Sequence, residues 1–348
     1  MRTIYLDYNA STPLDGGAAA AMQPYLTGHH ANPTGNHAAG KAAAEAVESA
    51  RAEVARFLDA EPEEIVFTSG ATEANNWVLR GVAEAHRAEG KHIIISAVEH
   101  PSIQNPCRAL QAAGLEVTTV PVDSHGRVSP EAIAAALRPD TLLVSVMHAN
   151  NEIGSIQPIA AIAEHVRRAG ARFHTDAALS AGKLPTRVAE LGVDFLTLAA
   201  HKMYGPKGVG ALFIRRGVTL EPLLRGGAQQ RGLRAGTENP MLATGFAAAC
   251  RVARGRLADD ARHMRDLRDR LQERLCNALG PNGARVFGHP TERLPNTLSI
   301  SFAGVDSRAL LAQVPHIAAS AGGASCSKGG MSPVLVAMGV EPEWGPGV

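Results

Sequence analysis

The sequence predicts an α/β fold, in which a mostly parallel, seven-stranded sheet is covered by helices on both faces and followed by a smaller α+β domain. Three observations lead to this prediction. Short apolar segments, typical of buried strands, alternate regularly with helical segments between residues 64 and 214. Near residue 245 this alternation gives way to one long amphipathic segment. The 348 residues are also enough for a large domain and a second, smaller one.

The expected elements of the large domain follow in chain order. An alanine-rich segment with helical spacing, over 38–58, comes before the first strand. Later helices fit between most of the strands, as in a sheet with parallel connections. The strands are expected at 64–68, 92–96, 117–122, 142–147, 172–175, 195–198 and 209–214. The helices between them are expected at 72–88, 101–113, 130–137 and 159–169.

The smaller domain is expected to combine residues 1–14 with residues 246–348, which leaves 15–245 as the large domain. An amphipathic helix over 241–279, either continuous or with one break, leads into a Pro-Asn-Gly turn. An isolated strand is expected at 297–302. The glycine- and serine-rich stretch that follows predicts a mobile loop over 321–332, which carries one of the cysteines.

Charge and cysteine usage exclude several classes of protein. The formal net charge is +1 and the basic stretch from Arg251 to Arg274 alternates with acids, so neither nucleic acid nor an anionic membrane is indicated as a partner. No apolar run reaches the length of a membrane span, and the N-terminus does not resemble a signal peptide. The four cysteines stand alone, without a CxxC pair. Their spacing argues against a disulfide framework or a metal site and favours a reducing, cytoplasmic location.

Lys202 lies in the stretch from Ala199 to Leu212, on a tight turn between two apolar runs that are expected to be buried strands. Partial desolvation in such a turn lowers the pKa of a lysine, which suits Schiff-base or nucleophilic chemistry. The alternative is an ordinary surface lysine in a β-turn, which for a single lysine is the commoner case. The rest of the chain decides between the two.

Polar residues follow other strands as well. The segment Thr68-Ser69-Gly70-Ala71-Thr72 opens a helix, and the free N–H groups of a helix N-terminus suit a phosphate. The alternative is a plain turn in which Thr72 or Ser69 caps the helix. Asp176 ends another strand, where a buried carboxylate needs a cationic partner such as a protonated pyridine nitrogen. Its alternative is again a helix cap.

Asn150 and Asn151 follow a further strand, where amide side chains can orient the oxygens of a ligand or simply form a turn. His100 also follows a strand and could stack on a flat ring or carry protons, although a lone histidine is more often structural. One doubly wound sheet would bring all of these strand ends to a single edge. Their joint occurrence therefore predicts one site that holds a phosphate, an acid, an amide and a reactive lysine.

Cys326 lies in the glycine-rich segment GGASCSKGG. Sulfur transfer needs a thiolate that reaches the substrate and then carries the sulfur away, and glycines on both sides permit such a swing. Lys328 is close enough in sequence to lower the pKa of the thiol. The polar flanks argue against the alternative of a buried cysteine. Cys107, Cys250 and Cys276 lie in helical patterns among apolar residues, and there the buried alternative is preferred.

Together these motifs resemble those of a cysteine desulfurase of the class V aminotransferase family, whose members are fold type I enzymes that use pyridoxal 5'-phosphate. The matching segments run in the family's order from residue 4 to about residue 340. Each is weak alone, but the set is highly specific. The segments read YLDYNAST, TSGATEANN, EHPSI, HANNEIGSIQP, HTDAA, HKMYGPKGVGAL, RAGTEN and GGASCSKGG.

The resemblance implies a reaction and roles for the residues that perform it. Lys202 would bind pyridoxal 5'-phosphate through a Schiff base, Asp176 would pair with the pyridine nitrogen, and His100 would stack on the ring. Cys326 would take sulfur from L-cysteine, giving L-alanine and a persulfide, while Lys202 or His100 moves protons. An acceptor protein, of the iron–sulfur scaffold or tRNA-thiolation type, would then collect the sulfur.

The resemblance also implies the remaining contacts of the cofactor. Asn151 would contact oxygens of the cofactor or substrate, and the phosphate would lie at Ala71, Thr72 and His201. Thr237, in the segment RAGTEN, resembles the residue that reaches the phosphate of the neighbouring subunit's cofactor. This match implies a homodimer.

The chain departs from the family pattern at three points. Leu179 stands where a glutamine usually contacts the ring hydroxyl, and Ala199 stands where a serine or threonine usually contacts the phosphate. The substrate-binding arginine of the usual C-terminal segment has no counterpart here. These departures predict a cofactor site with fewer polar contacts than usual and a weakened turnover of cysteine. Two alternatives remain open: a selenocysteine lyase or an aminotransferase for small amino acids with the same fold, and a non-catalytic scaffold derived from the family.

Overall fold

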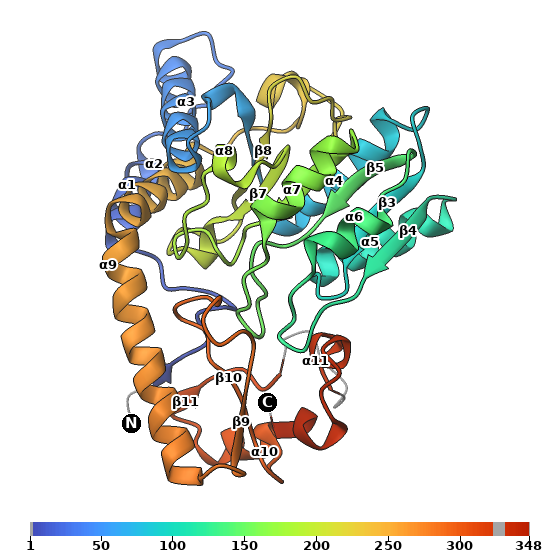
Figure 1. The fold of residues 1–348 in the computed structure, drawn as a ribbon. Coiled ribbons are helices and arrows are strands. Elements are labelled where there is room, and N and C mark those ends of the chain that lie inside the picture. The colour runs from blue at the N-terminus through green and yellow to red at the C-terminus, as the bar shows by residue number, and fades with distance from the viewer. Residues whose placement is uncertain (1–2, 323–330, 348) are drawn as a thin grey trace.

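A seven-stranded sheet lies at the centre of the computed structural model, which describes residues 3–322 and 331–347 (Figure 1). The neighbouring strands β7, β6, β5, β3 and β4 are parallel, whereas β8 is antiparallel to both β2 and β7. This arrangement confirms the predicted mostly parallel sheet of seven strands. In spatial order the strands are β2 (Ile65–Thr68), β8 (Gly210–Ile214), β7 (Phe195–Ala199), β6 (Arg172–Asp176), β5 (Thr141–Ser145), β3 (His92–Ser96) and β4 (Glu116–Val120).

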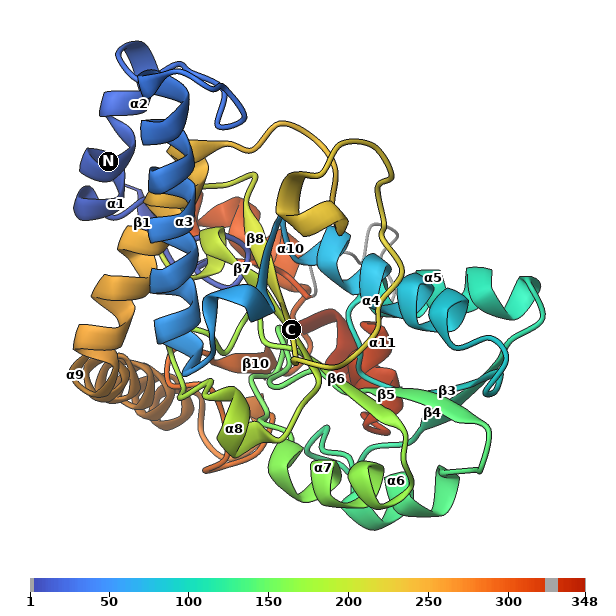
Figure 2. The same cartoon turned by 90° about the horizontal axis from the view of Figure 1, so that it is seen from above.

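Helices cover both faces of this sheet (Figure 2). The helices α4 and α5 pack on one face, while α6, α7, α8, α3 and the first part of α9 pack on the other. The long helices begin and end within three residues of the predicted bounds. The helical segments up to residue 232 are α1 (Gly16–Met22), α2 (Pro24–Thr27), α3 (Ala38–Leu58), η1 (Pro62–Glu64), α4 (Ala71–Ala85), α5 (Pro101–Ala112), α6 (Pro130–Ala136), α7 (Ile159–Arg168), α8 (Val188–Leu191), η2 (Ala200–Lys202) and η3 (Gln229–Gly232).

The alternation of side chains along each strand divides the core into two layers. In β3, Ile93 and Ile95 pack in the layer under α4 and α5, whereas Ile94 between them packs in the opposite layer. Trp77 of α4 is fully buried in the first layer. Burial of an aliphatic side chain contributes about 1.5–3 kcal/mol, so apolar strands that are covered on both faces make a rigid platform. Polar residues at the strand ends are held in place by this platform.

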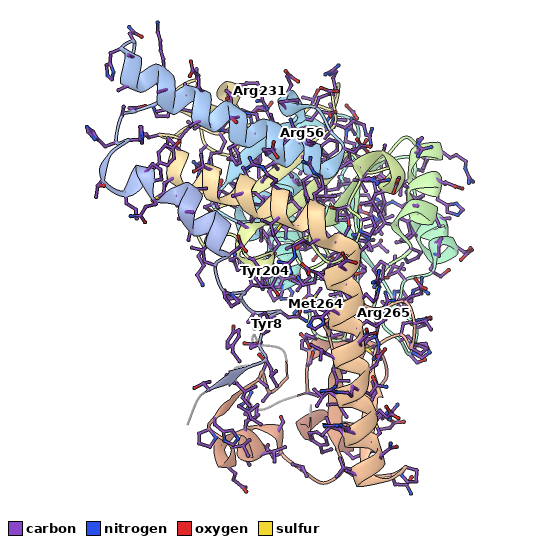
Figure 3. All side chains as sticks on the ribbon, turned by 90° about the vertical axis from the view of Figure 1, so that its left-hand side faces the viewer. Tyr8, Arg56, Tyr204, Arg231, Met264 and Arg265 are labelled. Atoms are coloured by element: carbon purple, nitrogen blue, oxygen red, sulfur yellow. The ribbon has the colours of Figure 1, made fainter. Side chains whose placement is uncertain are left out.

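The helix α9 (Pro240–Leu279) is continuous over 40 residues, so of the two alternatives for this segment the break is wrong. Asn239 caps its first turn through a side-chain hydrogen bond. Most of residues 243–250 are buried, several of them in the core layer on the α3 side of the main sheet, whereas the later turns of α9 are largely exposed. In Figure 3 the helix continues past Met264 and Arg265 toward the small C-terminal strands. One helix therefore connects the central sheet with the C-terminal part of the chain.

Two small sheets form the C-terminal part. β9 (Ala284–Phe287) pairs in antiparallel fashion with β10 (Ser299–Phe302), and β11 (Ile317–Ala318) pairs in parallel fashion with β1 (Ile4–Tyr5). The strand predicted at 297–302 is present as β10, but it is not isolated, because β9 pairs with it. That partner is short and only partly buried, so it gives no apolar run in the sequence. The other elements of this part are α10 (Ser307–Gln313), α11 (Pro333–Ala337) and η4 (Pro342–Gly347).

The first strand of the chain thus belongs to the C-terminal part of the structure, as the proposed grouping of residues 1–14 with residues 246–348 requires. The strands of the main sheet all fall between residues 65 and 214. The exact division at residues 15 and 245 stays a prediction. Among the described residues, every helix is too short or too polar to traverse a lipid bilayer.

Candidate active site

Four polar side chains follow strands of the main sheet at one edge. Lys202 ends η2 directly after β7, and Asp176 is the last residue of β6. His100 lies four residues beyond the end of β3, where it caps α5, and Asn151 lies in the turn after β5. Because β3, β5, β6 and β7 are parallel, their carboxyl ends meet at the same edge. The single edge expected from the sequence is therefore present.

The amine of Lys202 is held by backbone oxygens from the start of the chain. Its Nζ donates to the carbonyl oxygens of Asn9, at 2.5 Å, and Ala10, at 3.0 Å. Desolvation lowers the pKa of Lys202, while the nearby charges of Asp176 and Asp7 oppose this shift. A partly desolvated amine with a lowered pKa is a better nucleophile than a surface lysine. Lys202 is therefore not an ordinary surface lysine, and that alternative is wrong.

Asn9 links three segments around this amine, and nothing in the sequence beyond its place in YLDYNAST singles it out. Its Nδ2 donates to the carbonyl oxygen of Asn151, at 3.1 Å, and to Oγ1 of Thr297, at 2.9 Å. Its Oδ1 accepts a hydrogen bond of 2.9 Å from Asn296. These bonds fix the N-terminal segment between the edge of the large sheet and the C-terminal part of the chain, so the carbonyl groups that face Lys202 are held in position.

The carboxylate of Asp176 is buried and accepts one hydrogen bond on each oxygen. Asn75 Nδ2 donates to Oδ2 at 2.7 Å, and the backbone N–H of Ala178 donates to Oδ1 at 2.9 Å. Each carboxylate oxygen has two lone pairs, so each keeps one for a further donor. Such a buried, partly satisfied carboxylate suits a cationic N–H group. Asn75 is a functional candidate that the sequence reading missed, although an asparagine on the buried face of an apolar helix is itself a usable signal.

His100 presents an exposed imidazole ring at the start of α5. Its Nδ1 lies 2.8 Å from Ser102 Oγ and accepts the backbone N–H of Ser102 at 3.1 Å. Desolvation lowers the pKa of His100; Asp176 opposes this shift, and the charge of Lys202 adds to it. The ring is therefore oriented by the first turn of the helix and is neutral near pH 7.

The N-terminus of α4 is free of a side-chain cap. Gly70 is the N-cap residue, with φ of 152°, a conformation that a residue with a side chain rarely adopts. The alternative in which Ser69 or Thr72 caps the helix is therefore wrong. Ala71 and Thr72 begin the helix, and their backbone N–H groups remain suited to an anion. Arg234 binds both oxygens of Glu73, the next residue, and Oε2 of Glu73 also accepts the backbone N–H of Ser69 at 3.3 Å.

The two asparagines after β5 have different roles. Asn150 is buried and is used by the turn itself: its Oδ1 accepts from the backbone N–H groups of Glu152 and Ile153, at 2.8 and 3.0 Å. Asn151 is half-buried beside Asn9, and its side-chain amide makes no hydrogen bond to the residues that the structure describes. The turn interpretation therefore holds for Asn150, and the ligand interpretation stays a prediction for Asn151.

His201 is half-buried directly before Lys202. Desolvation lowers the pKa of its imidazole, and the charges of Lys202 and Lys207 lower it further. A neutral imidazole can donate a hydrogen bond to a phosphate oxygen without adding a second cation beside the amine. The predicted phosphate contact is thus compatible with the geometry, and it stays a prediction.

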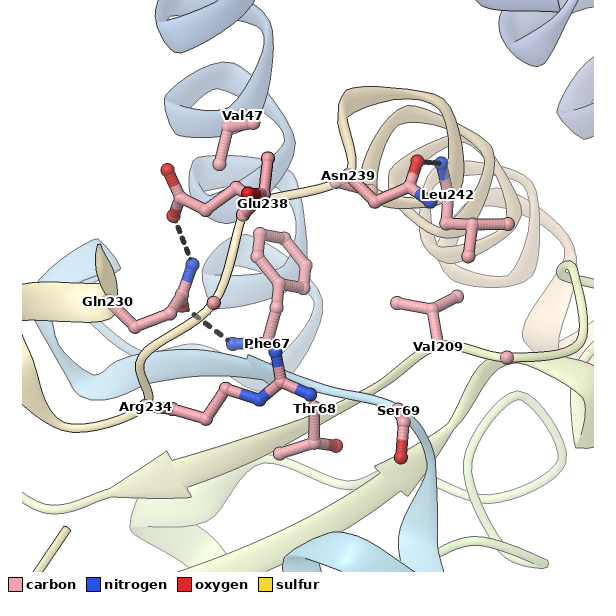
Figure 4. A pocket seen from close by; sticks show the side chains of 14 residues that line it. Val47, Phe67, Thr68, Ser69, Val209, Gln230, Arg234, Glu238, Asn239 and Leu242 are labelled. Atoms are coloured by element: carbon pink, nitrogen blue, oxygen red, sulfur yellow. Dashed lines mark hydrogen bonds between the residues drawn. The ribbon is translucent and has the colours of Figure 1, made fainter. Parts of the chain in front are cut away.

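Thr237 is exposed and lies in a separate pocket of about 160 Å³ that does not include Lys202, Asp176 or His100 among its lining residues (Figure 4). Gln230 closes one side of this pocket. Its Oε1 accepts the backbone N–H of Phe67 at 2.9 Å, and its Nε2 donates to Glu238. The segment with Thr237 is thus fixed to the end of β2, and Thr237 lines a pocket to which its own chain's Lys202 does not contribute.

An apolar cluster borders the edge where the family pattern has polar contacts. Leu179 and Ala199, the two departures from that pattern, are both buried and pack in one cluster. Ala71, at the start of α4, packs against the same cluster. Neither Leu179 nor Ala199 can donate a hydrogen bond, so this side of the site offers packing alone. The other members are Ala149, Ala178, Leu294, Ile156 and Leu184.

Cys326 lies outside the described residues, so its predicted role remains a prediction. The three described cysteines are free thiols on helices. Cys107 and Cys250 are buried, and burial raises the pKa of both thiols, to about 12 for Cys107. Cys276 is half-buried. The buried alternative is thus confirmed for Cys107 and Cys250.

Comparisons with known proteins agree with this geometry. A family model described as aminotransferase class V matches residues 4–342. The chain is 43% identical over 346 residues to the cysteine desulfurase IscS of Methanosarcina thermophila, covering 98% of this chain and 85% of that protein. It is 44% identical over 343 residues to the mitochondrial cysteine desulfurase of Saccharomyces cerevisiae, covering 97% of this chain and 68% of that protein.

Solved structures give the same result. A NifS-like protein superposes with a TM-score of 0.92 at 38% identity, covering 99% of this chain and 92% of the other. The protein SspA, solved in complex with cysteine, superposes with a TM-score of 0.87 at 33% identity, covering 99% of this chain and 96% of the other. The similarity therefore extends over nearly the whole chain, in sequence as well as in fold.

Proposed function

The chain belongs to the class V aminotransferase family and is a cysteine desulfurase, and from that premise we propose that it binds pyridoxal 5'-phosphate at Lys202 and transfers the sulfur of L-cysteine to Cys326. The family depends on this cofactor in general. The observation that carries the proposal is that the desolvated amine of Lys202 and the buried carboxylate of Asp176 lie at the same carboxyl edge of one sheet.

The residues of this edge fit the cofactor. Asp176 retains a lone pair on each oxygen for the pyridine N–H, and the exposed ring of His100 is suited to stacking. When bound, pyridoxal phosphate supplies an electron sink for the bonds next to the amino group of the substrate. Asp176 would hold the protonated nitrogen of that ring, and Lys202 would move protons at the substrate carbon.

The phosphate would be held by the uncapped start of α4, at Ala71 and Thr72, together with His201. Asn151 would bind oxygens of the cofactor or substrate. In a homodimer, Thr237 of one subunit would reach the phosphate in the other, and its exposure in a pocket that its own Lys202 does not line supports this arrangement. The apolar cluster of Leu179 and Ala199 supports the expectation that this cofactor site has fewer polar contacts than usual.

The sulfur step is assigned to Cys326 on the motif GGASCSKGG. The thiolate attacks the substrate sulfur, an S–S bond forms, the C–S bond breaks, and its electron pair is protonated at carbon to give L-alanine. The persulfide on Cys326 then passes its outer sulfur to an acceptor protein, of the type that builds iron–sulfur clusters or thiolates tRNA. The buried thiols of Cys107 and Cys250 are too protonated to replace it.

One experiment tests the proposal. The purified protein is expected to absorb in the near-visible and to lose that band on borohydride reduction. After reduction, the cofactor should be covalently attached to Lys202. With L-cysteine the protein is expected to release alanine and to gain the mass of one sulfur at Cys326. Cys326→Ala should abolish sulfur release, whereas Cys276→Ala should not.

Two results would contradict the proposal. A colourless protein that cannot be reconstituted with pyridoxal phosphate would favour a non-catalytic scaffold. Unchanged turnover in Cys326→Ala would favour an aminotransferase or a lyase that releases the chalcogen without a persulfide.

A further inference from the structure

A continuous run of hydrogen bonds joins His100 to Asp176 through two buried side chains. Asp176 Oδ2 lies 2.7 Å from Asn75 Nδ2, which lies 2.9 Å from Ser102 Oγ, which in turn lies 2.8 Å from His100 Nδ1. Asn75 is completely buried and Ser102 is nearly so. The two residues come from α4 and α5, on the same face of the sheet. Neither has a role in the proposed reaction so far.

The direction of each bond follows from the carboxylate. An ionised Asp176 can only accept, so Asn75 must turn its NH₂ group toward it. The second proton of the same NH₂ group then points to Ser102 Oγ, which accepts it. The hydroxyl proton of Ser102 has one remaining acceptor among the described residues, and that acceptor is Nδ1 of His100.

The backbone adds a second donor at the same nitrogen. The N–H of Ser102, in the first turn of α5, donates to His100 Nδ1 at 3.1 Å. This donor cannot rotate away, because the helix fixes it. Nδ1 thus accepts two hydrogen bonds and has no room for a proton of its own. The proton of the neutral ring must therefore sit on Nε2.

We infer that Asn75 and Ser102 are positioning residues that hold His100 as the neutral ring with its proton on Nε2. In this form His100 offers one N–H donor and a flat face. Accepting a proton at Nδ1 would require it to displace both Ser102 donors, and giving up the Nε2 proton would leave an imidazolate, which is far too basic to form near neutral pH. His100 therefore orients and stacks, and proton movement at the substrate falls to Lys202. This consequence rests on the proposed function; the tautomer itself does not.

The charges around the ring agree with a neutral His100. The ionisable groups that face it are Asp176, from β6, and Lys202, from η2, and they act on its pKa in opposite directions. Desolvation is the larger cause, and it lowers the pKa of His100. The positive end of the α5 helix dipole also lies at this residue and disfavours a cation there.

Nitrogen NMR of the protein labelled with ¹⁵N-histidine measures the tautomer directly. A ring nitrogen that carries a proton and one that does not differ widely in chemical shift, and the His100 signals are assigned by their loss in His100→Gln. We expect Nδ1 of His100 to be the bare nitrogen and Nε2 to carry the proton, with cofactor bound and after its removal. A wild-type spectrum with the proton on Nδ1, or with a cationic ring at neutral pH, overturns the inference.

Three variants test whether Ser102 sets this state. Ser102→Ala keeps the backbone donor and removes the hydroxyl, so the Nδ1 signal should shift toward the position of a protonated nitrogen. Ser102→Thr restores a hydroxyl and should restore the wild-type shift. Ser145→Ala is the matched control, since Ser145 is a buried serine that bonds Nδ1 of a different histidine, His174, at 2.8 Å. It should move the His174 signals and leave those of His100 unchanged.

An unchanged Nδ1 shift in folded Ser102→Ala would remove Ser102 Oγ, and with it Asn75, from the set of positioning residues. Because the spectra are recorded with and without cofactor, this result is independent of whether the protein turns over cysteine. Loss of the near-visible band at Lys202 with an intact His100 tautomer would instead contradict the proposed function alone. Circular dichroism of each variant confirms that the comparison is made between folded proteins.

Discussion

The buried amine of Lys183 donates a hydrogen bond of 2.9 Å to the carbonyl oxygen of Lys202 and a second, of 3.0 Å, to that of Leu179. Lys183 therefore ties the turn after β6, which starts at Asp176, to the turn after β7, which carries the reactive amine. No sequence motif pointed to this residue. Its side chain acts on the site through backbone groups, and it makes no contact that a motif search would register.

The pH dependence of stability should reveal Lys183. Burial, assisted by the charge of Lys202, lowers the pKa of Lys183 to about 7, from a usual value of about 10.4. Between these values the unfolded chain binds more protons at this position than the folded chain, so stability should rise with pH from 7 toward 10, by up to about 1.4 kcal/mol per pH unit. Urea unfolding of the holoprotein at several pH values measures this slope.

Lys183→Met should remove that rise, because methionine does not titrate. The matched control is Lys207→Met, which changes an exposed lysine in the turn before β8 and should keep the wild-type slope. Parallel stability curves for the wild type and Lys183→Met would show that Lys183 titrates normally. The Met variant should also be less stable at pH 9, since two buried carbonyl groups lose their donor, at about 1–3 kcal/mol.

His100→Phe should separate stacking from proton transfer. Phenylalanine keeps a flat ring, so cofactor affinity should change little. If His100 does not carry protons, turnover should fall by less than the roughly 10²–10⁴-fold that a general acid–base group contributes. Lys202→Ala should instead lose both the near-visible absorbance and alanine production. A loss of turnover beyond about 10²-fold in His100→Phe, with the cofactor still bound, would show that His100 does transfer protons.

Leu179→Gln should strengthen cofactor binding. Leu179 packs beside Ala199 in an apolar cluster, at the position where the family pattern has a donor to the ring hydroxyl. One added hydrogen bond is worth about 1 kcal/mol, which lowers the dissociation constant roughly fivefold. Leu184→Gln, in a partly buried member of the same cluster, provides the control and should give no gain. Spectroscopic titration of the apoprotein measures both, and equal or weaker binding in Leu179→Gln would count against the geometry.

Arg51→Met should destabilise the segment that presents Thr237. Arg51 is almost fully buried on α3, and its NH1 donates to the carbonyl oxygen of Ile65 and to Gln230 Oε1, at 2.9 and 2.8 Å. Gln230 adopts a left-handed conformation, with φ of 51°, which such bonds must hold in place. We expect a loss of about 2–5 kcal/mol in unfolding free energy.

Arg56→Met is the comparison for this variant, because Arg56 forms an exposed ion pair with Glu53 on the same helix. Exposed pairs contribute about 0–1 kcal/mol, so this change should be nearly neutral. The urea midpoints of the two variants and of the wild type decide the matter. Equal midpoints for Arg51→Met and Arg56→Met would mean that the buried guanidinium does not hold the segment.

The central sheet could be predicted from the sequence because its strands are apolar on both faces and are separated by helices. Blocks such as β3, in which every residue is buried, stand out against their flanks. The same rule failed at β9, whose residues are mostly half-buried. It also could not decide whether α9 is continuous, since the later turns of that helix are largely exposed and a period in the sequence does not report a bend.

The candidate site shows a similar division. The position of Lys202, Asp176 and His100 at one edge of the sheet could be predicted, because the carboxyl ends of parallel strands converge there. Asn75 and Lys183 could not, because their function depends on which atoms of distant segments lie within hydrogen-bond distance. Asn75 is 101 residues from Asp176 in the sequence, and only packing of α4 on the sheet brings the two together. Burying a polar side chain costs free energy unless it is hydrogen-bonded, so such a residue is expected to have a partner. Which residue that partner is depends on the fold.

The pairing of β1 with β11 has a consequence for the order of events during biosynthesis. Ile4 pairs with Ile317, and the carbonyl groups of Asn9 and Ala10 that bind Lys202 belong to the same N-terminal segment. At about 5–20 residues per second, a ribosome needs roughly 15–60 s to progress from the first of these strands to the second. During that interval the main sheet can form, whereas β1 has no partner strand until β11 has been synthesised. The amine of Lys202 therefore acquires its full surroundings only after most of the chain has been synthesised.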